Sequence, residues 1–181
     1  TKQKMGKIDY IINLASLSDV EASIKDPITF IQNNVWSMLN LLEYAREAKP
    51  RVFIQFSTDE VFGPTDGKSL YKEWDSLVPS NPYAASKAAQ EVISTSYWRT
   101  YDVPVIITHT MNNFGPMQQS SKFPVMIQKA TEKGEEIMIH GESNGEIGSR
   151  SYIHSRNVAD AVLFILKNAK PYLHQPLKVD K

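Results

Sequence analysis

The chain has no cysteine among its 181 residues. This absence excludes a disulfide framework and any site built on thiolate ligands. It also fits a reducing compartment, so we expect a cytoplasmic protein. No apolar run is long enough to span a bilayer, and the first residues lack the apolar core of a signal peptide.

The chain also lacks an excess of either charge, since 20 lysine and arginine residues balance 20 aspartate and glutamate residues. This balance gives no reason to expect nucleic acid or an anionic membrane as the main partner. A local basic pocket for a phosphate stays open. The four histidines have no metal-ligand spacing, so we take them as structural or surface residues and expect no metal site.

Glycine is scarce, and its 8 residues nowhere form the G-x-G-x-x-G turn that cradles a dinucleotide diphosphate. If the protein uses a dinucleotide, we therefore expect the first βαβ half of the fold to lie outside this chain.

Short apolar runs alternate with helical patterns along the chain. Runs at 10–14, 52–56 and 103–107 are typical of strands in a parallel sheet, and 137–139 is a weaker candidate. The alternation predicts an α/β fold with a doubly wound, Rossmann-like parallel sheet. Ligands of such sheets bind at the carboxyl ends of the strands, which points to the loops 15–19, 57–63 and 108–115.

Two helices have clear start signals. Asp26-Pro27 and Asn81-Pro82 each supply an N-cap followed by proline, and we expect the second helix to reach about Tyr101. Further helices are predicted at 123–133 and 155–167. The helix from Pro27 carries an apolar stripe that we expect to face the core, formed by Ile31, Val35, Met38, Leu42 and Ala45.

Two groups of residues are candidates for chemistry. Tyr83 and Lys87 lie one helical turn apart, where a lysine cation would lower the pKa of the phenol. Ser57-Thr58-Asp59-Glu60 follows a strand directly, and two neighbouring carboxyl groups can serve as acid and base. Each group has a plainer interpretation. The pair could be a packed aromatic with a solvated lysine, and the second segment could be a polar turn or a helix cap.

Polar residues after the third strand could bind a sugar. Asn112 and Asn113 precede a Gly-Pro turn and could hydrogen-bond sugar hydroxyls, although all these residues are also common in turns. Lys122 and Arg150 could pair with a diphosphate, or could be surface charges.

Taken together, these segments resemble the extended short-chain dehydrogenase/reductase superfamily, in its order and approximate spacing over nearly the whole chain. The Tyr83-x-x-x-Lys87 pair marks that superfamily. The triplet Thr58-Asp59-Glu60 is similar to its dTDP-glucose 4,6-dehydratase branch, which includes relatives that act on UDP-sugars. The segment 150–160 resembles the family's late arginine motif and the helix after it.

The resemblance implies dehydration of a nucleotide-diphosphate hexose, dTDP-glucose or a UDP-sugar, to a 4-keto-6-deoxy sugar. Tyr83 would take the proton of the 4-hydroxyl, which Thr58 holds, while a hydride passes from C4 to NAD. Glu60 would remove the C5 proton and Asp59 would protonate the departing 6-hydroxyl before the hydride returns to C6. The implied NAD contacts are Leu14, Ala15, Ser16, Ser57, Tyr83 and Lys87, and the implied substrate contacts are Asn112, Asn113, Lys122 and Arg150.

The resemblance also implies an organisation. Residues 1–110 would be the C-terminal half of a Rossmann-like NAD-binding domain. Residues 111–181 would be mainly substrate-binding, with a helix at 155–168 that returns to the main domain. The helices from Pro27 and Pro82 would form a homodimer, in which Trp36, Tyr97 and Trp98 supply aromatic area. Without a glycine turn, we expect the chain by itself to bind NAD poorly and to be catalytically silent.

Two other functions remain open. The first is a nucleotide-sugar epimerase, reductase or decarboxylase of the same superfamily; Asp59-Glu60 argues against an epimerase, because inversion at C4 needs no acid–base pair for elimination. The second is a non-catalytic fragment that binds a nucleotide sugar weakly or not at all, which the missing glycine turn favours.

Overall fold

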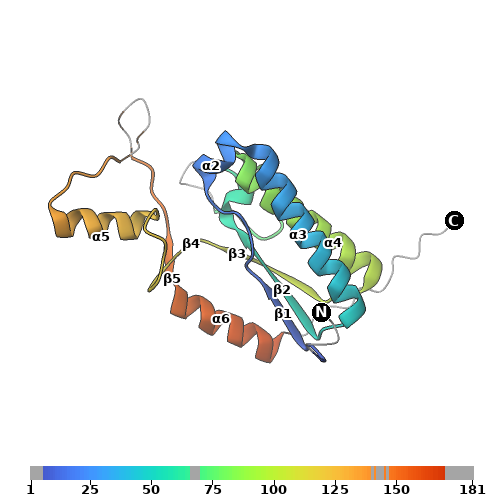
Figure 1. The fold of residues 1–181 in the computed structure, drawn as a ribbon. Coiled ribbons are helices and arrows are strands. Elements are labelled where there is room, and N and C mark those ends of the chain that lie inside the picture. The colour runs from blue at the N-terminus through green and yellow to red at the C-terminus, as the bar shows by residue number, and fades with distance from the viewer. Residues whose placement is uncertain (1–5, 66–69, 140, 142–144, 146, 170–181) are drawn as a thin grey trace. The chain divides into compact units, whose positions relative to one another are not determined.

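The computed structural model describes residues 6–65, 70–139, 141, 145 and 147–169. These residues belong to two compact units, one ending at Thr110 and the other running from Met111 to Ala169. Figure 1 shows the ribbon of both units, which are described in turn. The predicted return of the helix at 155–168 to the main domain stays a prediction.

The first unit is built on a parallel sheet of three strands in the order β1-β2-β3. The strands are β1 (Tyr10–Asn13), β2 (Val52–Thr58) and β3 (Val105–Thr110). Their register pairs Ile11 with Phe53, and Phe53 with Val105. The prediction of an α/β fold with a parallel sheet is confirmed. All three strands end at the same edge, so the residues that follow them are brought close together.

Three helices connect these strands: α2 (Val20–Lys25), α3 (Pro27–Ala48) and α4 (Pro82–Tyr101). The two long helices, α3 and α4, lie side by side against the sheet (Figure 1). Both begin where the sequence predicts. The Asp26 carboxylate accepts a hydrogen bond from the Thr29 amide, and the Asn81 side chain accepts one from the Ala84 amide.

The buried face of α3 differs from the predicted apolar stripe. Ile31 is 43% exposed, and Asn34 is fully buried in its place. Asn34 tolerates burial because its side chain exchanges hydrogen bonds with the backbone of Leu17 and donates one to the Ser86 hydroxyl. The face that packs inward consists of Phe30, Asn34, Met38, Leu42 and Ala45.

The core of the first unit lies between α3 and the sheet. Met38, Leu42 and Phe53 are fully buried there, and burial of side chains of this size contributes about 1.5–3 kcal/mol each. The remaining buried members of this core are Ile11, Ala45 and Val103.

The second unit contains a parallel pair of short strands, β4 (Asn112–Phe114) and β5 (Tyr152–His154), with helices α5 (Phe123–Lys133) and α6 (Ser155–Asn168). Both helices were predicted; the two strands were not. The predicted strand at 137–139 is wrong, because no strand in the described part of the chain pairs with this segment and Met138 is 83% exposed. No helix in the described part of the chain is both long and apolar enough to span a membrane.

Candidate active site

The residues that follow β2 form a tight turn at the carboxyl edge of the sheet. A single turn of 3-10 helix, η1 (Asp59–Phe62), begins directly after Thr58. The Thr58 hydroxyl accepts a hydrogen bond from the Glu60 amide at 3.3 Å and donates one to the Asp59 carboxylate at 3.2 Å. The plainer interpretation of this segment, a helix cap, therefore applies to Thr58, and the cap places both carboxyl groups at the strand end.

The start of α4 lies against this turn. Asn81 caps the helix with its side-chain oxygen and donates from its nitrogen to the Glu60 carboxylate at 3.1 Å. The Tyr83 phenol lies next to the Thr58 side chain and is close enough to Glu60 and Asp59 for both carboxylates to affect its pKa. The structure thus brings together four of the predicted catalytic residues, and Asn81 joins them as a residue that the sequence analysis missed.

The pKa of the Tyr83 phenol is raised, to about 12, which is opposite to the predicted direction. Burial is the largest cause, and the Glu60 carboxylate adds to it because a second negative charge nearby is unfavourable. The hydrogen bond with Thr58 acts against both effects by favouring the phenolate.

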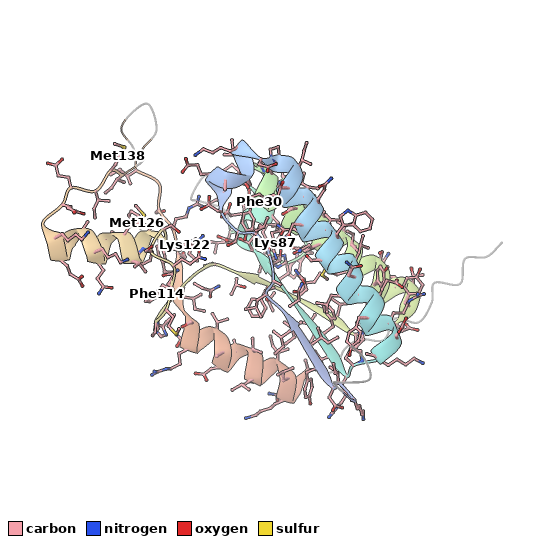
Figure 2. The ribbon with its side chains drawn as sticks, in the orientation of Figure 1. Phe30, Lys87, Phe114, Lys122, Met126 and Met138 are labelled. Atoms are coloured by element: carbon pink, nitrogen blue, oxygen red, sulfur yellow. The ribbon has the colours of Figure 1, made fainter. Side chains whose placement is uncertain are left out.

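Lys87 does not lower the pKa of Tyr83 because its ammonium group is held elsewhere. The Nζ atom donates to the Phe56 carbonyl oxygen at 2.6 Å and to the Gln90 side-chain oxygen at 2.8 Å. Lys87 is 4% exposed and lies inside the first unit (Figure 2). Burial lowers its pKa to about 8, although the Glu91 carboxylate opposes that shift.

A buried polar network fixes Lys87 in this place. Gln55, in the middle of β2, donates to Gln90 at 2.9 Å and accepts from Asn13 at 2.7 Å. Gln90 in turn donates to the backbone oxygen of Asn34 at 2.8 Å. The sequence analysis missed these residues, although a glutamine and an asparagine inside apolar strands were a usable signal, because a buried amide needs a partner.

The loop after β1 is the predicted cofactor contact. The Ala15 amide donates to the Asn13 side chain at 3.2 Å, and the Ser16 hydroxyl donates to the Leu17 carbonyl oxygen at 3.1 Å. Leu14 is 61% exposed. The loop shares the carboxyl edge of the sheet with the end of β2. The loop residues and the Tyr83 phenol offer hydrogen-bond donors and an apolar surface that fit a nicotinamide and its ribose. The given sequence has no glycine turn for the diphosphate.

The predicted substrate contacts all lie in the second unit. Asn112 and Asn113 are on β4, and the Asn112 side chain donates to the Ser151 carbonyl oxygen at 3.1 Å. Lys122 immediately precedes α5, and Arg150 is exposed two residues before β5. The convergence of these residues on one ligand with the first unit stays a prediction.

Comparison with known proteins settles the family. The family model for the NAD dependent epimerase/dehydratase family matches residues 2–175. The chain belongs to this family.

Relatives in the epimerase/dehydratase family include several 4,6-dehydratases. The chain is 36% identical over 168 residues to human dTDP-D-glucose 4,6-dehydratase, covering 91% of this chain and 46% of the human protein. It is 42% identical over 138 residues to the low-salt glycan biosynthesis protein Agl12 of Haloferax volcanii, covering 75% of this chain and 44% of that protein.

A solved structure gives the same picture. A double mutant of DesIV, a dTDP-glucose 4,6-dehydratase from Streptomyces venezuelae solved with NAD bound, matches with a TM-score of 0.85 and 28% identity. The match covers 93% of this chain and 51% of that one. The chain thus spans about half the length of the relatives it matches.

Proposed function

We propose that this chain is part of an NAD-dependent nucleotide-sugar 4,6-dehydratase, a lyase that acts on dTDP-glucose or a UDP-sugar. The observation that carries the proposal is the η1 turn, which puts two carboxyl groups beside Tyr83 at the end of a parallel strand. Relatives named as dTDP-glucose 4,6-dehydratases support it. Oxidation and reduction at C4 need only the tyrosine, whereas elimination of water also needs an acid and a base.

In the first step, Tyr83 removes the proton from the sugar 4-hydroxyl. Thr58 supports this role, because its side chain acts to lower the pKa of the phenol and its hydroxyl can contact the same sugar oxygen. Lys87 is assigned to the cofactor ribose; with a pKa of about 8 it is mainly a cation at neutral pH.

In the elimination step, Glu60 removes the C5 proton and Asp59 protonates the departing 6-hydroxyl. The Asn81 amide orients the Glu60 carboxylate, and the Thr58 hydroxyl orients that of Asp59. Each carboxyl group is thereby oriented by a different hydrogen-bond donor, as separate acid and base roles require.

NAD would supply the hydride chemistry, as the acceptor for the hydride of C4 and its donor to C6. We assign its nicotinamide and ribose end to Leu14, Ala15, Ser16, Ser57, Tyr83 and Lys87. We assign the nucleotide sugar to Asn112, Asn113, Lys122 and Arg150, whose amides and charges suit hydroxyl groups and a diphosphate.

The test is turnover by the protein produced from its complete reading frame. Incubation with NAD and a panel of dTDP- and UDP-hexoses should give a product lighter by one water, with a keto group at C4. Glu60→Gln should abolish this product, whereas the matched exposed change Glu21→Gln on α2 should not. An epimerised sugar of unchanged mass would refute the dehydratase in favour of an epimerase. Absence of any product would refute both activities.

We further propose a homodimer formed through α3 and α4. Large apolar side chains on these helices are exposed, namely Ile28 at 67%, Trp36 at 62% and Val92 at 63%. Tyr97, in contrast, packs within the chain, where its hydroxyl donates to Glu43 at 2.6 Å. A second copy would cover the exposed residues. The cytoplasmic location also stays a proposal.

A further inference from the structure

A buried carboxylate on α4 contacts the carboxyl ends of β2 and β3, next to the candidate site. Glu91 is on α4, one turn after Lys87, and is 6% exposed. One of its oxygens accepts a hydrogen bond from the Ser57 hydroxyl, and the other lies 3.0 Å from Nε2 of His109. The mechanism proposed above makes no use of this group.

The two partners of Glu91 come from neighbouring strands. Ser57 on β2 and His109 on β3 are paired in the parallel register, so their side chains project from the same face of the sheet. Glu91 therefore joins the carboxyl ends of both strands to α4, with one oxygen on each strand. A donor at each oxygen also explains why a carboxylate is tolerated in this buried position.

The same three residues reach both ends of the η1 turn. Ser57 directly precedes Thr58, from which the turn begins. At the other end, the His109 ring packs against Phe62, the last residue of the turn, with ring centroids 4.7 Å apart. Phe62 is itself 5% exposed, so this contact is part of the packed interior. Asp59 and Glu60, the two carboxyl groups of the turn, lie between these two contacts.

We propose that Glu91 is a positioning residue that fixes the η1 turn, through Ser57 at its start and through His109 and Phe62 at its end. The inference rests on the proposed function, because the turn carries the acid–base pair Asp59 and Glu60. A carboxylate contacts Ser57 and His109 with one acceptor oxygen each. In glutamine an NH2 group replaces one of these oxygens, so one contact is lost unless Ser57 or His109 turns its own proton away.

Amide hydrogen exchange on this chain tests the positioning without any catalytic assay. In Glu91→Gln, the amides of residues 57–63 should exchange about tenfold faster, while those of α3 keep their rate. The matched control is Ser94→Ala, which removes another fully buried hydrogen bond on α4, the one from the Ser94 hydroxyl to the Gln90 carbonyl oxygen. An unchanged rate in the turn overturns the proposal. Equal acceleration throughout α3 does the same, since it shows a general loss of stability.

Kinetics of the protein from the complete reading frame provide the second test. Glu91→Gln should lower kcat roughly 10- to 100-fold with little change in KM, because substrate binding does not need an aligned acid–base pair. His109→Gln should act likewise, and the double variant should be no worse than the poorer single one. Parent-like kcat in Glu91→Gln overturns the positioning role. If the parent protein makes no dehydrated product, the proposed function fails, and hydrogen exchange alone then decides whether Glu91 fixes the turn.

Discussion

Replacing Lys87 by methionine should change how the stability of the chain depends on pH. The folded state holds Lys87 with a pKa of about 8, against 10.5 for an unperturbed lysine. Between these two pH values the unfolded chain binds a proton that the folded chain does not, so stability rises with pH in this window. Below about pH 8 the penalty for the buried cation is fully present.

The size of the effect follows from the two pKa values. At about 1.4 kcal/mol for each pH unit, the full interval from about 8 to 10.5 corresponds to about 3 kcal/mol. The pH range suited to this measurement ends near pH 10. Above it, Tyr83 and Tyr97 ionise in the unfolded chain but not in the folded chain, where their pKa values are raised to about 12, so stability falls. Between pH 8 and pH 10 we therefore expect about 2 kcal/mol relative to Lys87→Met.

The variant is a fair comparison because it leaves no acceptor without a donor. Both oxygens that bind Lys87, the Phe56 carbonyl and the Gln90 side chain, also accept from the Gln55 amide. Urea unfolding of both proteins at several pH values gives the difference directly. Parallel stability curves for parent and variant between pH 8 and pH 10 would show that the pKa of Lys87 is not depressed in the folded chain.

Four further predictions concern the site, the assembly and the core. In the protein from the complete reading frame, Tyr83→Phe should abolish turnover with the fold intact, as judged by product formation and circular dichroism; parent-rate turnover would remove Tyr83 as the base. Asp59→Asn and Glu60→Gln should block elimination more than the first oxidation, so that NADH absorbance accumulates after substrate is added, and product formation without that signal would contradict the assigned roles. Light scattering at micromolar concentration should give a dimer mass that Trp36→Glu reduces, whereas a monomer mass for the parent would refute the α3–α4 interface. Leu42→Ala should lower the free energy of unfolding by about 2–5 kcal/mol in urea titration, because Leu42 is fully buried in the core; a loss below about 1 kcal/mol would contradict that packing.

The regular parts of the fold could be predicted because their signals are local. Asp26-Pro27 and Asn81-Pro82 start helices through contacts within four residues, and both helices begin as expected. The apolar runs at 10–14 and 52–56 became strands for the same reason. The run at 137–139 is shorter and pairs with no strand in the described residues, and strand formation depends on a partner. The short strands β4 and β5 escaped prediction because they depend on each other across the sequence.

The candidate site was predictable in its residues and less so in its electrostatics. Its members could be named because the carboxyl ends of parallel strands meet, and the resemblance gave Thr58, Glu60 and Tyr83 their roles. The predicted direction of the Tyr83 pKa shift was wrong. Helical spacing indicates that Lys87 is on the same face of the helix, but it does not indicate where the ammonium group binds. That position depends on Gln55 and Gln90, which come from different elements and meet only in the fold.

Buried amides in apolar segments could have corrected this error. Burial of an amide without a partner costs on the order of 1–3 kcal/mol, so a glutamine inside β2 implies a polar group opposite it on a neighbouring element. Asn13 and Gln55 sit opposite each other on β1 and β2, and Asn34 and Gln90 occupy the facing sides of α3 and α4. Gln55 links Asn13 to Gln90, and Gln90 donates to the backbone oxygen of Asn34, so hydrogen bonds connect four elements and hold Lys87 through Gln90. The Lys87 ammonium group binds the Phe56 carbonyl and the Gln90 side chain in this network, so these buried amides were a signal that it is held away from the Tyr83 phenol.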